Sequence, residues 1–258
     1  MPVWETRGAR LDYEVQGDSG PWVVQLHGLT SSRSRDAQLG LDLGRALRGH
    51  RVLRYDARAH GLSTGTSREE DYRWDRLADD LLGLLDHVVG EDRVHGVGPS
   101  MGTGTLLHAA VRDPDRFRTL TLVTPPTSRG RRRAQAESYR EQADRIEQGG
   151  MPAEALGNTA PVPPALADAP ETRPSVPAAL LPTVLRGAAA TDLPGRSKIS
   201  RIPSPTLILA WTGDRTHPLA TARRLDELIP RSRLVVARSP YGVMAWPGLF
   251  AEHVTTAS

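Results

Sequence analysis

The sequence predicts an α/β fold in which a mostly parallel sheet is covered by helices on both faces. Short runs rich in β-branched residues recur along the chain and are bounded by turn residues, as buried strands are. Segments with helical periodicity lie between these runs, and this alternation is typical of a parallel sheet. The 258 residues suffice for one substantial core, so we expect a single domain over residues 1–258.

The expected elements alternate from residue 22 onward. Strands are predicted at residues 22–26, 51–55, 93–97, 119–123, 206–210 and 233–237. Helices are predicted between them at residues 39–47, 72–88, 103–111 and 220–228. Residues 3–6 and 11–16 have the pattern of an antiparallel hairpin that opens the sheet.

The stretch from about residue 125 to 203 breaks this alternation. It is rich in Pro, Ala and Arg and has no strand pattern, so we interpret it as an inserted helical cap. Helices are predicted there at residues 132–148, 151–157 and 177–187, each ended by Pro or Gly. A disordered linker is the alternative that composition leaves open.

Composition excludes several classes of protein. The net charge of +3 is too small to indicate a nucleic-acid binder, and no apolar run is long enough to span a membrane. The chain has no cysteine, which excludes disulfides and thiolate metal sites. The N-terminus lacks the pattern of a secretory signal, so a cytoplasmic location is expected.

A G-x-S-x-G pentapeptide, Gly98-Pro99-Ser100-Met101-Gly102, lies between a predicted strand and a predicted helix. This placement is typical of a nucleophile elbow, where a tight turn exposes the serine hydroxyl at a helix N-terminus. Ser100 is therefore the predicted nucleophile. A serine that only caps the helix is the alternative.

With these motifs the chain resembles the α/β-hydrolase family along nearly its whole length. The resemblance implies an eight-stranded, mostly parallel sheet with a helical cap. The loop His27-Gly28-Leu29-Thr30 is similar to the family's oxyanion loop, which assigns the N–H groups of Leu29 and Met101 to an oxyanion hole. Residues 56–63 resemble a D-x-R-G-H-G-x-S turn that supports the fold, with Ala59 in place of a glycine.

The same resemblance assigns Asp214 as the triad acid, because it falls on the acid of the family's D-x-x-x-P pattern. The family's histidine belongs in the loop after the last strand, where this chain has Val243. Valine accepts no proton, so we expect an incomplete triad. His217, three residues after Asp214, is the candidate replacement base, and a helix-capping role is its alternative. His27, Gly28 and Val243 are expected to border the substrate.

A run of arginines, Arg129-Gly130-Arg131-Arg132-Arg133, begins the first predicted cap helix, where positive charge opposes the helix dipole. An anionic substrate or partner would explain the run. A solvated charged face is the plainer interpretation.

Two functions from different classes follow. The first is hydrolysis of a small ester, lactone or thioester through Ser100. The second is a non-hydrolytic reaction, such as epimerisation, isomerisation or cyclisation, in which the oxyanion hole stabilises an enolate and Asp214 acts as base. This second function rests on the expected absence of the histidine and on a similarity to atypical family members such as the bottromycin-pathway epimerase.

A silent ligand-binding protein is a third possibility. The expected partner is a small-molecule or peptide substrate, and no cofactor, metal, nucleic acid or membrane is implied. Composition does not indicate an oligomeric state.

Overall fold

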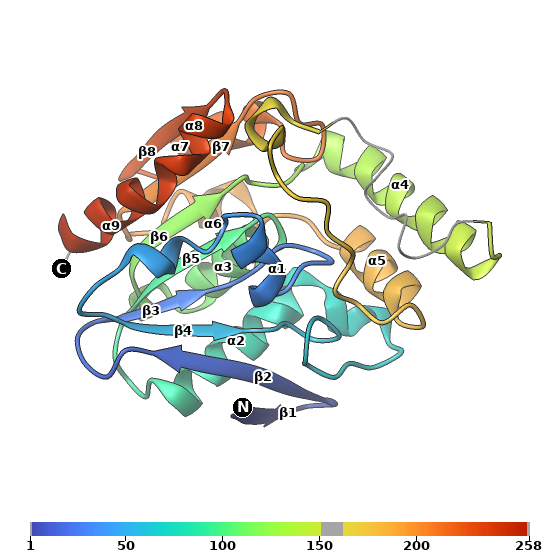
Figure 1. Cartoon of the computed structure of the whole chain (residues 1–258), viewed down its shortest axis with the longest axis horizontal. Helices are drawn as coiled ribbons and strands as arrows, with labels where there is room; N and C mark the ends of the chain where they lie inside the picture. Colours follow the sequence, from blue (N-terminus) through green and yellow to red (C-terminus); the bar gives the residue numbers. More distant parts are fainter. Residues whose placement is uncertain (1, 151–161, 257–258) are drawn as a thin grey trace.

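The strands form one eight-stranded sheet with the N-terminal hairpin at one edge and the last strand at the other (Figure 1). A computed structural model describes residues 2–150 and 162–256. The strand order is β1-β2-β4-β3-β5-β6-β7-β8, and all neighbours from β4 to β8 are parallel, whereas β1, β2 and β4 pair antiparallel. The strands are β1 Val3–Thr6, β2 Ala9–Gln16, β3 Trp22–Gln25, β4 Arg51–Tyr55, β5 Val94–Pro99, β6 Phe117–Val123, β7 Thr206–Trp211 and β8 Ser232–Ala237. The predicted fold class is confirmed.

Helices cover both faces of the sheet, and each face has its own apolar core. Successive strand residues point to opposite faces, so Val24 joins one core while Val23 joins the other. The first core is closed by α2, α3 and α7, and the second by α9 and the short helix η1. The helices are α1 Arg33–Gln38, α2 Trp74–Val88, α3 Met101–Arg112, α4 Gly130–Glu147, α5 Leu181–Ala189, α6 Arg196–Ile199, α7 Leu219–Leu228, α8 Pro240–Met244 and α9 Trp246–Thr256. Single helical turns are η1 Leu43–Ala46, η2 Glu69–Tyr72, η3 Pro114–Arg116 and η5 Pro164–Leu166.

The helix predicted over residues 39–47 is wrong. The chain instead forms α1, which begins after Ser32, whose hydroxyl accepts the N–H of Arg35 at 3.1 Å. Gly40 then adopts a left-handed φ of 72°, the conformation in which helices commonly end. The helices predicted over 72–88, 103–111 and 220–228 are formed as α2, α3 and α7.

Helices also connect β6 to β7, and the described residues of this connection contain no strand. α4 and α5 pack against each other to one side of the sheet (Figure 1). They correspond to the helices predicted over 132–148 and 177–187, whereas the one predicted over 151–157 lies outside the described residues. We propose that residues from about 125 to 203 form a cap inserted into the single domain.

Among the described residues, no helix combines the length and the apolar character needed to cross a bilayer.

A buried ion pair anchors the turn after β4 to α2. Arg58 donates to both carboxylate oxygens of Asp80, and its third nitrogen donates to the carbonyl of Arg7 at 2.7 Å. Arg58 and Asp80 are only 3% and 4% exposed, so removing the carboxylate would leave a buried, unpaired cation. This pair explains how the turn at residues 56–63 supports the fold.

Asp80→Ala is expected to lower the free energy of unfolding by about 3–5 kcal/mol, because the Arg58 guanidinium stays buried without its partner. Urea denaturation measures the change. Asp79→Ala is the matched control, since the Asp79 side chain is 40% exposed and pairs with Arg76 and Arg112 at the surface. Asp79→Ala is expected to lower the free energy of unfolding by less than about 1 kcal/mol. Equal losses in the two variants would contradict the buried-pair account.

Candidate active site

Ser100 lies in the sharp turn between β5, which ends at Pro99, and α3, which begins at Met101. Its backbone angles are φ 51° and ψ −106°, a strained conformation for a residue with a side chain. Its flanking glycines permit close packing, since a Cβ on Gly102 would lie 2.9 Å from Cβ of Leu26. The turn therefore has the geometry of a nucleophile elbow.

The loop after β7 brings an imidazole to this serine. Nε2 of His217 lies 2.8 Å from Oγ of Ser100, and Nδ1 lies 2.7 Å from Oδ2 of Asp214. A carboxylate only accepts, so Nδ1 carries the hydrogen and Nε2 is free to accept the hydroxyl proton. The three side chains form one hydrogen-bonded chain with the polarity that a general base requires.

Asp214 also holds the shape of its own loop. Its Oδ1 accepts the N–H groups of Thr216 at 2.8 Å and His217 at 3.1 Å, which folds the loop into a tight turn. Its Oδ2 accepts the indole N–H of Trp211 at 2.8 Å. Burial opposes ionisation, but the hydrogen bonds from His217 and Trp211 outweigh it and hold the pKa of Asp214 well below its ordinary value. The carboxylate is therefore ionised at neutral pH.

The predicted incomplete triad is wrong, because an imidazole does lie within hydrogen-bond distance of Ser100. Val243 does stand in α8, after the last strand, but its side chain packs into the second apolar core and not beside Ser100. His217 reaches the hydroxyl instead, because the loops after β5 and β7 both leave the carboxyl edge of the sheet. The acid and the imidazole thus come from one loop, three residues apart.

The predicted oxyanion loop lies directly over the elbow. A Cβ on Gly28 would lie 3.9 Å from Cβ of Ser100, which places the two loops in contact distance of each other. Met101 is the first residue of α3, so its N–H has no intrahelical acceptor. Leu29 follows Gly28 and packs against the apolar cluster beneath α4 and α5. The oxyanion loop and the start of α3 thus both lie next to Ser100.

Two buried histidines fix this loop. Nε2 of His27 accepts the N–H of Ala57 at 2.9 Å, and Nε2 of His60 accepts the N–H of Thr30 at 3.2 Å. Their Nδ1 atoms lie 2.8 Å and 2.6 Å from the carbonyls of Gly28 and Arg58. Each ring accepts once and donates once, so both are neutral, and the His27 ring supports the loop without a nitrogen left for a substrate.

These neutral rings predict a loss of stability in acid. Burial lowers the pKa of His27 to about 4 and that of His60 to about 3, whereas both titrate near 6.5 when unfolded. Burial likewise lowers the pKa of His95 to about 4. Below pH 6.5 the unfolded chain binds protons that the native chain does not, so stability present above pH 6.5 is lost as the pH falls toward 4. Asp36 opposes this loss, because burial raises its pKa to about 7.

We expect the free energy of unfolding to fall by about 2–4 kcal/mol between pH 7.5 and pH 5, measured by urea denaturation. Asp36→Asn removes the opposing contribution and should make the fall steeper. Stability that is constant or rises over this range would show that the histidines are not held neutral.

Sequence reasoning missed Trp211 as a residue of this site. Its indole N–H orients Asp214, and its ring lies 6.2 Å from that of His217. The feature of the sequence that could have identified Trp211 is its position at the end of β7, three residues before Asp214.

Comparison with known proteins agrees with this geometry. A family model for the alpha/beta hydrolase fold matches residues 21–241. The chain belongs to the α/β-hydrolase family. This α/β hydrolase is 30% identical over 196 residues to 3-oxoadipate enol-lactonase 2 of Acinetobacter baylyi, covering 74% of this chain and 71% of the relative.

Solved structures show the same fold. A hydrolase from Pseudomonas aeruginosa PA01 superposes with a TM-score of 0.78 at 27% identity, covering 99% of this chain and 97% of the other. The bottromycin epimerase BotH, bound to bottromycin A2, superposes with a TM-score of 0.71 at 20% identity, covering 99% of this chain and 96% of the other. At that identity, the likeness to the epimerase concerns the fold alone.

Proposed function

We propose that this α/β hydrolase cleaves a small ester or lactone by acyl transfer through Ser100. The observation that carries the proposal is the hydrogen-bonded chain from Ser100 through His217 to Asp214 at the elbow. Such a chain activates a hydroxyl that is otherwise un-ionised and poorly nucleophilic at neutral pH. Thioesters undergo the same acyl transfer and belong to the same proposed substrate class.

In this mechanism, Nε2 of His217 takes the proton as Oγ of Ser100 attacks the substrate carbonyl. The N–H groups of Leu29 and Met101 stabilise the negative charge that develops on the carbonyl oxygen. The protonated His217 then donates to the leaving alkoxide, which departs as an alcohol and leaves an acyl-enzyme. A water, deprotonated by His217, releases the acid and restores Ser100.

Asp214 has two proposed roles. It fixes the tautomer in which Nδ1 carries the hydrogen, and it stabilises the imidazolium that forms during each step. The His217 and Asp214 side chains keep only 18% and 11% of their accessible surface, so water weakens this pair less than it would at the surface.

A lactone is favoured among esters because a relative that matches 74% of this chain is named an enol-lactonase.

Hydrolysis of p-nitrophenyl butyrate and of a panel of lactones tests the proposal. We expect p-nitrophenol release through an acyl-enzyme, with a burst that approaches the enzyme concentration when deacylation is the slow step, and its loss in Ser100→Ala. The non-hydrolytic alternative rests on a missing base, whereas Nε2 of His217 lies 2.8 Å from Oγ of Ser100, which favours hydrolysis. Incorporation of solvent deuterium into an intact substrate, with no cleavage of any ester or lactone, would overturn hydrolysis and restore that alternative.

A further inference from the structure

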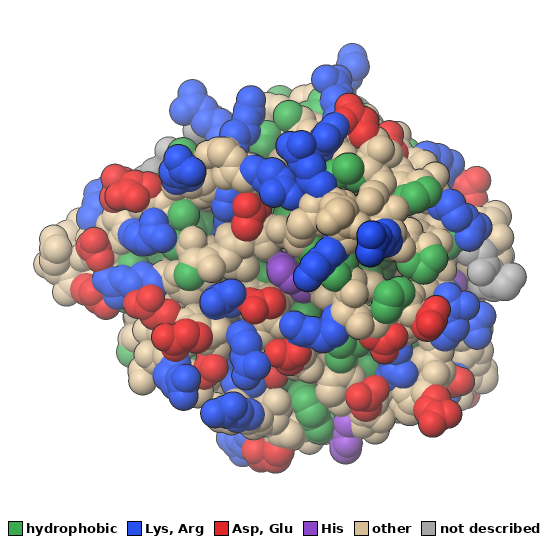
Figure 2. All heavy atoms as spheres, turned by 180° about the vertical axis from the view of Figure 1, so that it is seen from behind, with side chains coloured by type: hydrophobic (Ala, Val, Ile, Leu, Met, Phe, Trp, Pro, Cys, Tyr) green, Lys and Arg blue, Asp and Glu red, His purple; other side chains and the backbone are tan. Residues whose placement is uncertain are grey.

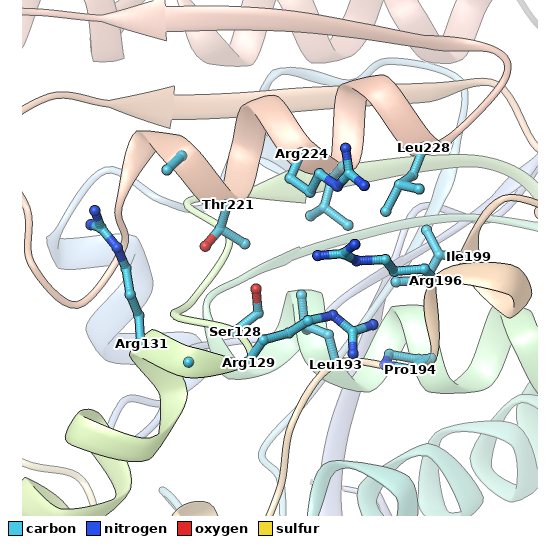
Figure 3. Close-up of a pocket in the computed structure, with 13 residues that line it drawn as sticks. Ser128, Arg129, Arg131, Leu193, Pro194, Arg196, Ile199, Thr221, Arg224 and Leu228 are labelled. Atoms are coloured by element: carbon cyan, nitrogen blue, oxygen red, sulfur yellow. The ribbon is translucent and has the colours of Figure 1, made fainter.

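A cavity outside the proposed active site gathers four arginines from three separate elements (Figure 3). It has a volume of about 300 Å³ and lies between the start of α4, the segment that contains α6, and α7. Arg129 and Arg131 line it from the start of α4, Arg196 from α6 and Arg224 from α7. Among residues 2–150 and 162–256, no acidic residue lines the cavity, and neither do Ser100 and His217.

The positive charge at this cavity is largely uncompensated. Within residues 2–150 and 162–256, Arg129, Arg131 and Arg196 have no carboxylate within ion-pair distance, whereas Arg224 pairs with Glu227 at 2.6 Å. The carboxylate of Asp192, which precedes the lining residue Leu193, accepts the backbone N–H groups of Arg129 at 3.0 Å and Leu193 at 2.7 Å. Figure 2 shows Lys and Arg side chains gathered on the upper part of one face of the molecule. Clustered like charges repel, so a bound anion would stabilise this arrangement.

The start of α4 adds to the same potential. The helix has 18 residues, and its first turn contains no acidic side chain. Arg129 precedes it with a left-handed φ of 54°, and Gly130 lines the cavity. Free N–H groups at a helix N-terminus favour an anion, so the helix and the arginines act in the same direction.

The structure separates the roles within the arginine run. Arg132 is buried, donates to the carbonyls of Thr191 and Ala188, and stacks 4.3 Å above the ring of Trp74, so it anchors the cap. Arg133 is exposed and does not line the cavity. Only Arg129 and Arg131 of the run face the cavity, and Arg133 is a natural control for them.

The remaining wall is apolar. Leu193, Ile199, Leu225 and Leu228 line the cavity beside the arginines. A guanidinium group can donate two parallel hydrogen bonds to two oxygens of a phosphate or a carboxylate. A carboxylate has only two oxygens, whereas a phosphate has further oxygens that can accept from a second arginine. We propose that this cavity binds a phosphorylated small molecule with an apolar portion, at a site separate from Ser100. The proposal does not depend on the hydrolytic function.

Isothermal titration calorimetry with hexyl phosphate, at fixed low salt, tests the proposal. The wild type is expected to bind at one saturable site. Arg196→Gln and Arg129→Gln should each weaken binding by about tenfold or more, because each removes charge-assisted hydrogen bonds, and both residues are exposed enough to leave the fold intact. Arg133→Gln should leave the affinity within about twofold, since it preserves the site while removing the same charge.

Two further ligands separate the contribution of the phosphate group from that of the alkyl chain. Inorganic phosphate should bind more weakly than hexyl phosphate in the wild type, and Leu228→Ser should reduce this difference. Hexanoate should bind more weakly than hexyl phosphate. The absence of saturable binding, or equal weakening by Arg133→Gln and Arg196→Gln, would overturn the site. Equal affinity for hexyl phosphate and inorganic phosphate would overturn the apolar portion of the ligand.

Discussion

His217→Gln is expected to lower kcat for hydrolysis of an aryl ester by about 10³-fold or more. Glutamine fills a similar space but cannot take the proton from Oγ of Ser100, which lies 2.8 Å from Nε2 of the imidazole in the native protein. The hydroxyl then stays protonated and poorly nucleophilic. Steady-state kinetics measure the loss, and the residual rate reports what the oxyanion hole and substrate binding supply without a base.

Two variants make this result specific. His87→Gln, the same change at an exposed histidine of α2, should leave kcat unchanged. The double variant Ser100→Ala, His217→Gln should be about as slow as either single variant, because groups that act as a unit are not additive. A His217→Gln enzyme that keeps its activity within about tenfold would refute His217 as the base.

Asp214→Asn is expected to lower kcat by about 10³–10⁴-fold with little change in KM. The amide oxygen can still accept the N–H groups of Thr216 and His217, so the loop keeps its shape. The amide NH₂ can however donate to Nδ1 of His217, which favours the tautomer whose Nε2 carries the hydrogen. An imidazole in that tautomer cannot accept the proton of Ser100.

The split between kcat and KM distinguishes this role from simple damage to the site. Far-UV circular dichroism and unfolding measurements should show a folded Asn variant. A loss that appears only in KM, or a fall in kcat of less than about tenfold, would show that Asp214 does not set the tautomer of His217.

Most of the fold was predictable from the sequence because strand and helix periods are local signals. The β-branched runs located the parallel strands, and Gly98 to Gly102 located the elbow between β5 and α3. The helix predicted over 39–47 is wrong, although the spacing of its apolar residues is helical. Gly40 adopts a left-handed φ, and α1 ends before this glycine.

The candidate site was only partly predictable. The sequence points to Ser100, Asp214 and His217, yet it predicts an incomplete triad, because periodicity does not give the direction of a side chain within a tight turn. The spacing of Asp214 and His217 held the clue, since an aspartate often bonds the N–H groups two and three residues later and so fixes the turn. The packing of Val243 into a core, by contrast, needed tertiary contacts.

Covalent labelling with a fluorophosphonate tests the central claim most directly, because the probe reacts much faster with an activated serine than with an ordinary hydroxyl. Intact-mass spectrometry should show one adduct on the wild type, peptide mapping should place it on Ser100, and His217→Gln should label more slowly by about 10³-fold. An unlabelled wild type, an adduct on another residue, or equal labelling rates with and without the imidazole would contradict the account.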